Sequence, residues 1–346
     1  MKKFKRHRDY GFFDQDIRLS KLSHLGDPLE KLKQGIDFEF FRPLLETELT
    51  KSAKGKGGRP PYDYLLMFKI LILQRYYNLS DDQVEYQIND RMSFMRFLDL
   101  AIADDVPDSK TVWKFREQLI DLGLVGRLFD LFLSELEKLG LVVHEGKIVD
   151  ASFIEVPRQG NSREENREIK EGKTPESILS NPAKKAQKDV DARWTKKNNV
   201  SYFGYKNHAK IDTKSKIITG YKVTDASVHD SQVLDGLLDK EKDGGQEFHA
   251  DSAYTGVNAE ECIENKEMIN QVCEQGYRNK PLTQSQREAN REKSKVRSRV
   301  EHIFGFMETA MNGMSLQNIG TKRIDAVVGL TNLTYNMFRK LQLQAI

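Results

Sequence analysis

The sequence has few cysteines, and this scarcity argues against a fold held by disulfides or cysteine-bound zinc. Its two cysteines are Cys262 and Cys273, and neither belongs to a paired cysteine motif. Disulfide frameworks and cysteine zinc sites need more thiols at regular spacings. We therefore expect a protein of the reducing cytoplasm.

Long apolar segments are also missing. The longest run, 65–73, is interrupted by Lys69, whereas a membrane-spanning helix needs about 20 apolar residues. The basic N-terminus, 1–8, is not followed by the apolar stretch of a secretory signal. The sequence thus predicts no membrane segment, and the run 65–73 indicates a buried helix.

The total charge says little about partners, but its distribution says more. The 55 Lys and Arg exceed the 52 Asp and Glu by +3. In the stretch 278–299, Glu288 and Glu292 are the only acids among the basic residues Arg278, Lys280, Arg287, Arg291, Lys293, Lys295, Arg297 and Arg299. Such a stretch faces phosphates in some proteins and is a solvated helix face in others.

The first 145 residues have helical patterns. Apolar residues recur at helical spacing over 62–77, and Ser80 with Gln83 forms a capping-box pattern that opens a helix to about Asn89. A further helix is predicted to start at Pro107. Three short helices with tight turns favour a helix-turn-helix-like DNA-binding region, although such triplets also occur in proteins that never bind DNA.

The second half, 146–346, alternates between strand and helix patterns. We expect five strands, at 147–156, 201–211, 217–224, 247–251 and 268–273, and helices at 229–238, 258–265, 285–311 and 323–341. A charged segment, 158–199, is predicted to be an extended or partly disordered insertion. This order predicts an α/β, ribonuclease-H-like domain with a mixed five-stranded sheet and helices on its faces.

Three acids occupy positions that suit a metal site. Asp150 lies inside the first strand, Asp251 ends the fourth, and Glu301 lies within the helix 285–311, four residues after Arg297. Each acid alone is more typical of a cap, a salt bridge or a solvated surface. In the expected fold, however, all three meet at one end of the sheet. Carboxylate oxygens suit Mg²⁺ or Mn²⁺, and two such ions can catalyse an in-line displacement at phosphate.

A family resemblance joins these patterns. The segments that carry it are Gly58-Arg-Pro-Pro-Tyr-Asp, Leu65-Leu-Met-Phe-Lys, Leu79-Ser-Asp-Asp-Gln, Phe94-Met-Arg-Phe-Leu, Pro107-Asp-Ser-Lys-Thr-Val-Trp, Val149-Asp-Ala-Ser, Phe203-Gly-Tyr-Lys-Asn-His, Ala226-Ser-Val-His-Asp, Ala250-Asp-Ser-Ala-Tyr and Arg299-Val-Glu-His-Ile-Phe. In these segments the chain resembles a DDE transposase of a bacterial insertion sequence, of the insertion-sequence-five group within the insertion-sequence-four superfamily.

The resemblance implies an activity, a site and partners. It implies a helical DNA-binding region, 1–145, before a catalytic domain, 146–346, and it makes Asp150, Asp251 and Glu301 the ligands of two Mg²⁺ or Mn²⁺ ions. The expected reaction is cleavage at the terminal inverted repeats and transfer of the freed 3′-hydroxyl into target DNA. Because two ends must meet, a homodimer on DNA is expected.

The neighbourhood of the third acid departs from the superfamily pattern. The superfamily often has a Tyr, an Arg and a Lys around this acid. Arg297 fits, but Ser294 stands at the Tyr position and Glu308 at the Lys position. An acid at this position either weakens the phosphate contact of that Lys or leaves the contact to Lys293 or Lys295.

Other candidates have two interpretations each. Lys206 and His208 alternate on one strand face, which could contact DNA or be merely solvated; Arg297 and Arg299 are further candidates for DNA contact. His229 and Asp230 could support the metal site, or Asp230 could cap a helix. For the whole chain, a nuclease of the same fold and a catalytically silent DNA-binding protein are the alternatives.

Overall fold

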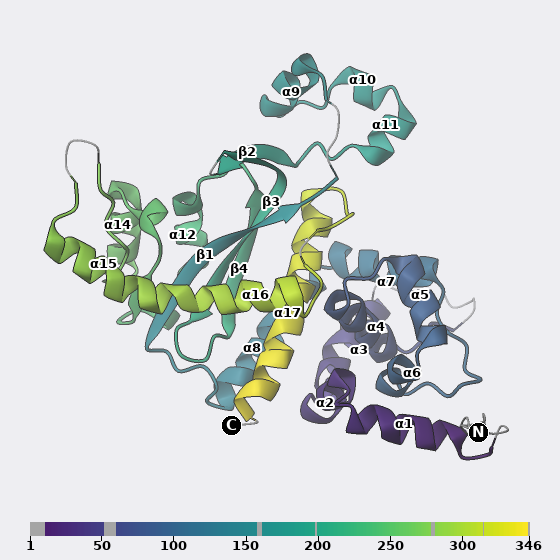
Figure 1. Cartoon of the computed structure of the whole chain (residues 1–346). Helices are drawn as coiled ribbons and strands as arrows, with labels where there is room; N and C mark the ends of the chain where they lie inside the picture. The colour runs from purple at the N-terminus through teal and green to yellow at the C-terminus, as the bar shows by residue number, and fades with distance from the viewer. Residues whose placement is uncertain are drawn as a thin grey trace, which may run out of the picture. The chain divides into compact units, whose positions relative to one another are not determined.

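The computed structural model of the chain (Figure 1) describes residues 11–51, 60–157, 161–197, 199–277, 281–313 and 315–344. Gly58, Arg59, Arg278 and Lys280, which belong to the sequence patterns above, lie outside these ranges. The chain forms two compact units. The helical unit contains residues 1–73 and 79–114, and the sheet unit contains residues 74–78 and 115–346.

The helical unit confirms the predicted all-α N-terminal region. Its helices are α1 (Asp14–His24), α2 (Pro28–Gly35), η1 (Phe38–Phe41), α3 (Arg42–Lys51), α4 (Tyr64–Tyr76), α5 (Asp81–Asp90), α6 (Met92–Leu98) and the first part of α7 (Ser109–Asp121). The capping box is present at α5, where the Ser80 hydroxyl accepts from Gln83 N at 3.2 Å and Ser80 N donates to Gln83 Oε1 at 3.0 Å. Arg91 alone separates α5 from α6.

The apolar run 65–73 is the buried helix that its composition predicts. Phe68 is fully buried and meets Phe41 at 5.0 Å between ring centroids. Lys69 is accommodated because its ammonium lies 5.5 Å from the Phe38 ring centroid and donates to Asp99 at 2.7 Å. A buried cation that has such partners avoids most of the penalty of an unpaired charge.

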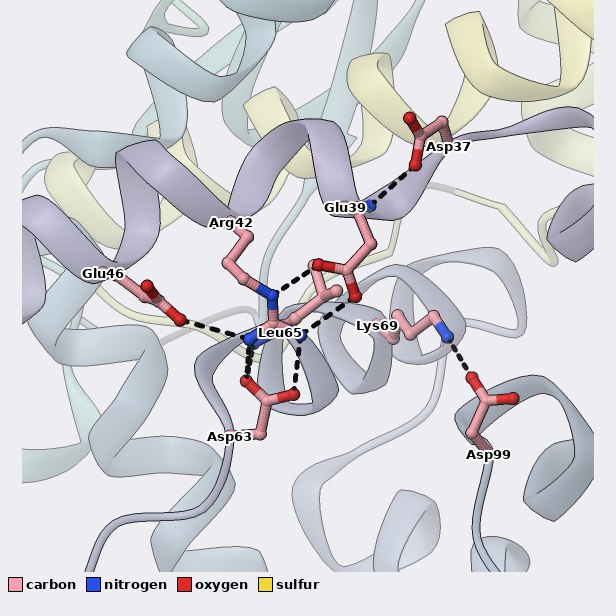
Figure 2. Close-up of polar contacts among 8 residues, drawn as sticks. All are labelled: Asp37, Glu39, Arg42, Glu46, Asp63, Leu65, Lys69 and Asp99. Carbon is pink, nitrogen blue, oxygen red and sulfur yellow. Dashed lines mark hydrogen bonds and ion pairs between the residues drawn. The ribbon is translucent and has the colours of Figure 1, made fainter.

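A cluster of charges connects α3 with the start of α4. Figure 2 shows Arg42 of α3 between three carboxylates: its guanidinium bonds both oxygens of Asp63, at 2.8 and 3.1 Å, together with Glu39 and Glu46. Asp63 also accepts from Leu65 N at 3.1 Å, at the first turn of α4. We call Arg42, Glu39, Glu46 and Asp63 the Arg42 cluster. Its hydrogen bonds hold the pKa of Arg42 above the usual range.

Arg42→Ala is expected to loosen this connection only modestly. The three carboxylates are 47–64% exposed, so solvent screening limits the effect to about 1 kcal/mol. Hydrogen exchange of the full chain should accelerate in 39–51 and 63–73, and less so in 1 M NaCl than at low salt. Arg42→Lys is the control, since it keeps the charge but loses the two-pronged contact. Unchanged exchange in Arg42→Ala would contradict the assignment.

The sheet unit is built on the mixed sheet expected from the sequence. Its strands are β1 (Gly146–Glu155), β2 (Arg193–Lys197), β3 (Val200–Asp212), β4 (Ile218–Asp225), β5 (Glu247–His249) and β6 (Ile269–Asn270). They form a six-stranded sheet in the order β2-β3-β1-β5-β6, with β4 also paired to β3. β1 is antiparallel to β3, and β5 is parallel to β1 and β6. The predicted α/β, ribonuclease-H-like arrangement is confirmed, with β2 as a sixth strand.

Helices cover both faces of the sheet. On one face, α17 (Thr321–Gln344) packs against α8 (Leu124–Lys138) and β4, and Asn332 and Asn207 exchange side-chain hydrogen bonds across the interface. On the other face lie the short helices η2 (Asp230–Val233), α12 (Leu234–Leu237), α13 (Lys240–Asp243) and η3 (Ser252–Tyr254), with α14 (Val257–Asn265). Their core cluster includes Val149, Leu234, Phe248 and Ile263. Because α8 packs on α17, residues 115–145 group with the sheet rather than with the helical unit.

The charged insertion is folded, so the expectation of an extended or partly disordered segment is wrong for residues 161–197. It contains α9 (Arg163–Lys170), α10 (Glu176–Leu179), α11 (Pro182–Gln187) and β2. Ser162 and Glu165 form a capping box at α9, and Ile169 and Ile178 are buried. A few buried apolar residues and well-placed caps outweigh the polar composition here.

None of the helices in the described ranges is long and apolar enough to cross a membrane.

Candidate active site

Asp150 and Asp251 lie near each other at the end of the pairing between two neighbouring strands. The parallel pairing of β1 with β5 ends at Ile148 opposite His249. Asp150 follows Ile148 by two residues within β1, and Asp251 follows His249, the last residue of β5, by two residues. Residues two apart point to the same face of a sheet. Asp251 comes just after the end of β5, where its Oδ1 accepts from Ala253 N at 2.8 Å and caps η3. The sheet therefore brings the first two predicted acids together.

The Asp150 carboxylate is buried and has an unusually high proton affinity. Its side chain is 15% exposed; Oδ1 accepts from Ala151 N at 2.8 Å and Oδ2 from Arg297 at 3.1 Å. Burial raises the pKa of Asp150 to about 6, and the negative charge of Asp251 adds to this, while the Ala151 amide, Arg297 and Lys197 act in the opposite direction. Loss of solvent around the carboxylate is therefore the main cause of the raised pKa, and the positive charges of Arg297 and Lys197 offset it only in part.

Glu301 stands at the edge of this site. The single helix predicted over 285–311 is wrong, because the chain forms three elements there: α15 (Gln284–Arg297), η4 (Ser298–Val300) and α16 (Glu301–Thr309). Glu301 is therefore the first residue of α16 and does not lie within a long helix. At the break, Ser298 Oγ bonds Lys295 O at 3.0 Å, a contact that competes with regular helix. The Glu301 side chain is 66% exposed, 4.0 Å from Arg297.

These residues suit a divalent ion in part. Asp150 and Asp251 offer hard oxygen ligands, and their mutual repulsion is of the kind that a bound cation relieves. Arg297, however, lies between Asp150 and Glu301 and contacts both. Within the ranges that the structure covers, no three Asp, Glu, His or Cys side chains are close enough to share a metal ion. The two aspartates offer oxygen ligands for such an ion, whereas Glu301 is 66% exposed and is separated from Asp150 by Arg297.

His229 shares a cavity with Asp251. The cavity measures about 330 Å³ and is lined by His229, Asp251, Ser252, Ala253, Thr255 and Gln275. His229 is the cap of η2, and its Nδ1 accepts from Ser231 N at 3.4 Å. The structure therefore places His229 beside the second acid. Asp230 is the first residue of η2 and not its cap.

Lys206 and His208 are not available as a DNA-contacting strand face. Lys206 is 8% exposed and donates to Asp230 and to Val228 O, both at 2.8 Å. His208 is fully buried, and Nε2 lies 2.9 Å from Thr224 Oγ1. Burial lowers the pKa of His208 to about 4, even though Asp230 opposes this. The expectation of direct DNA contact by these two residues does not fit their burial.

The basic residues of the last helical region have different surroundings. Lys293 donates to Val272 O at 3.0 Å, and Arg299 donates to Thr213 O at 2.9 Å. Both are partly buried, whereas Lys295 is exposed and pairs with Glu292 at 2.6 Å. Contact of Lys293, Lys295, Arg297 or Arg299 with phosphates stays a prediction.

Two further features of this part of the sheet unit concern Lys197 and Glu308. Lys197, at the end of β2, lies within electrostatic reach of Asp150. Glu308 faces a cavity of about 420 Å³ whose other lining residues are Ser152, Phe153, Glu155, Tyr202, Gly313 and Ser315. The sequence does not distinguish Lys197 from the many other lysines of the insertion.

Comparison with known families agrees with this architecture. Residues 17–118 match the family described as a Transposase domain (DUF772), and residues 143–337 match the family described as a Transposase DDE domain. The second match covers more than half of the chain, which therefore belongs to the DDE transposase family. Members of this family bind DNA and generally use divalent metal ions. No solved structure matches the chain.

Proposed function

We propose that this chain is a transposase of the insertion-sequence-five group that cleaves DNA at the ends of its element and joins the freed 3′-hydroxyl to target DNA. The observation that carries the proposal is the proximity of Asp150, on β1, to Asp251, just after the end of the parallel strand β5, in a chain where both transposase families match in order. Among the side chains that the structure describes, Asp150 forms an ion pair with Arg297 alone, and Asp251 forms none.

In this proposal Asp150 and Asp251 hold the metal, and Glu301 completes the set. When bound, two Mg²⁺ or Mn²⁺ ions supply an activated attacking oxygen and stabilise the leaving one. Arg297 stabilises the Asp150 carboxylate in the metal-free state, and its guanidinium would be available to a DNA phosphate if Asp150 and Glu301 held a metal instead. The Lys206–Asp230 ion pair fixes the start of η2 and thereby the position of His229.

DNA contacts are proposed for both parts of the chain. The region 1–145 would bind the terminal inverted repeats, and the basic residues of 285–299 would contact the backbone near the site. A homodimer on DNA would bring two ends together. Binding through several phosphates should weaken steeply as salt rises.

A catalytically silent DNA-binding protein is the second candidate. It is favoured by one observation, the exposed position of Glu301 with Arg297 between it and Asp150. Such a protein would bind element ends with the same affinity in EDTA and in Mg²⁺ and would never nick them.

Metal removal and strand transfer test the proposal together. Purified full-length protein is incubated with a labelled element end and a plasmid target, in Mg²⁺, in Mn²⁺ and in EDTA. We expect nicking only with metal, and joined products when the end is supplied pre-cleaved with a 3′-hydroxyl. A 3′-deoxy end is the control, because it cannot attack. Nicking without joining would indicate a nuclease, and no nicking with either metal would indicate the silent alternative.

A further inference from the structure

Helix α1 is attached to the helical unit by one face only. None of its 11 residues is buried, although helices of this length are marginal in water unless an apolar face packs against something. On the attached face, Leu19 and Leu22 are half-buried. Arg96 of α6 donates to Leu19 O at 3.4 Å and to Ser23 Oγ at 2.8 Å. The other face of α1 points outward.

The outward face exposes large apolar side chains. Phe12 and Phe13, at the start of α1, are 94% and 64% exposed. Ile17 in its middle is 45% exposed, and Leu25 at its C-cap is 84% exposed. Single exposed apolar residues are common, whereas a contiguous group of them marks an interaction surface. An open hollow of about 750 Å³ runs along this face and is lined by Asp16, Ile17, Ser20, Lys21, His24 and Leu25.

The outward residues recur at the spacing of a seam between two helices. Phe13, Ile17, Ser20 and His24 follow one another at intervals of four, three and four residues. This is the a and d pattern of a coiled coil, and Ile at an a position favours two parallel strands. The Nδ1 of His24 lies 2.7 Å from Ser20 O, so its ring is held along the same stripe. The outward face of α1 therefore has the spacing that pairs two helices.

The charges beside this stripe are complementary to those of an identical helix. Asp16 and Lys21 flank the stripe on opposite sides, five residues apart, at positions g and e of the same pattern. In a parallel pair, position g of one helix faces position e of the other, so each Asp16 meets the Lys21 of the second copy. Among the described residues, neither has an ion-pair partner in its own chain. Asp14 and Asp16 also balance Arg18 and Lys21, so this face has no excess positive charge to attract phosphates.

We propose that the outward face of α1 binds the same face of a second copy of this chain, parallel and in register. Ile17 and Phe13 then meet their counterparts, and the apolar surface that one chain leaves in water is covered. One short helix makes a small interface, so the dimer should be weak, with a Kd on the order of 10 µM. The pairing needs neither metal nor DNA and does not rest on the proposed function, although it would supply the dimer that joining two ends requires.

Sedimentation velocity of the full-length protein without DNA, from about 1 to about 100 µM, tests the pairing. The parent should change from monomer to dimer across this range. Ile17→Glu should weaken dimerisation at least tenfold, because it removes an apolar contact from both copies and brings two like charges together. Ile102→Glu is the matched control, since Ile102 is 63% exposed in the same helical unit but outside α1. It should leave the Kd within twofold of the parent, and both variants should keep the parent's melting temperature, because exposed side chains are replaced.

Charge reversal tests the parallel arrangement. Asp16→Lys alone should weaken the dimer about fivefold, since it replaces two exposed ion pairs with like charges. Adding Lys21→Asp should restore the Kd to within twofold of the parent, because the two ion pairs form again in the opposite sense. A parent that stays monomeric at about 100 µM, an Ile17→Glu variant that dimerises as tightly as Ile102→Glu, or a double variant that stays as weak as Asp16→Lys would each overturn the proposal. None of these results depends on DNA cleavage, so they leave the proposed function to its own test.

Discussion

Asp150→Asn is expected to abolish metal-dependent cleavage while leaving the metal-free protein at least as stable as the parent. An amide offers one neutral oxygen in place of a carboxylate, and it binds divalent cations far less well. Removing a single electrostatic stabiliser of a reaction slows it by on the order of 10²–10³-fold, and loss of a metal ligand should not be milder. Nicking of a labelled element end in Mg²⁺ measures the effect.

The stability half of this prediction follows from the burial of Asp150. Its pKa of about 6 lies above the usual 3.8, so the native state holds this proton more tightly than the unfolded chain does. The carboxylate therefore destabilises the metal-free fold increasingly as pH rises from about 4 to 6, and the effect vanishes below about 4. The difference corresponds to at most about 3 kcal/mol, and the loss of the Arg297 ion pair offsets part of it.

Melting curves in EDTA at two pH values test whether the Asp150 carboxylate destabilises the metal-free fold. Asp150→Asn should melt at a temperature equal to or above that of the parent at pH 7.5, and the two proteins should converge near pH 4. Asp235→Asn is the matched control, since Asp235 is 89% exposed and pairs only with Lys266 among the ion pairs of the described chain. It should change neither cleavage nor melting appreciably. Full cleavage by Asp150→Asn would remove this residue from the site.

The placement of Asp150 and Asp251 could be predicted from the sequence because short-range patterns suffice for it. The β-branched run around Asp150 and the polar break after His249 indicate a strand interior and a strand end. The parallel pairing then follows from the order of elements, and the structure shows it as a register of Ile148 with His249. Local chemistry and topology point to the same arrangement here.

The same sequence patterns do not predict whether a strand face is buried. The alternation of Lys206 and His208 correctly places them on one face, but a period of two does not say what covers that face. In the structure, η2 covers it and Asp230 neutralises Lys206. The sequence likewise does not predict the break in the helix before Glu301. The break coincides with one side-chain contact of Ser298, which composition does not indicate.

Asp189→Ala is expected to cause the largest loss of stability among the changes considered. Asp189 is 2% exposed and accepts hydrogen bonds from the Tyr205 hydroxyl at 2.8 Å, Ala192 N at 3.1 Å and Gly320 N at 3.1 Å. It therefore ties the insertion to β3 and to the start of α17. Truncation leaves several buried donors without an acceptor, at a cost of about 3–5 kcal/mol. The melting temperature should fall by on the order of 10 °C.

Two variants separate this network from its surroundings. Tyr205→Phe removes one donor and keeps the backbone contacts of Asp189, so a loss of about 1–2 kcal/mol is expected. Asp191→Ala removes an exposed acceptor of Thr321 N and should cost less than about 1 kcal/mol. Urea unfolding followed by circular dichroism ranks the three. If Asp191→Ala lowered the free energy of unfolding as much as Asp189→Ala, the buried Asp189 carboxylate would not be the group that holds the insertion to β3 and α17.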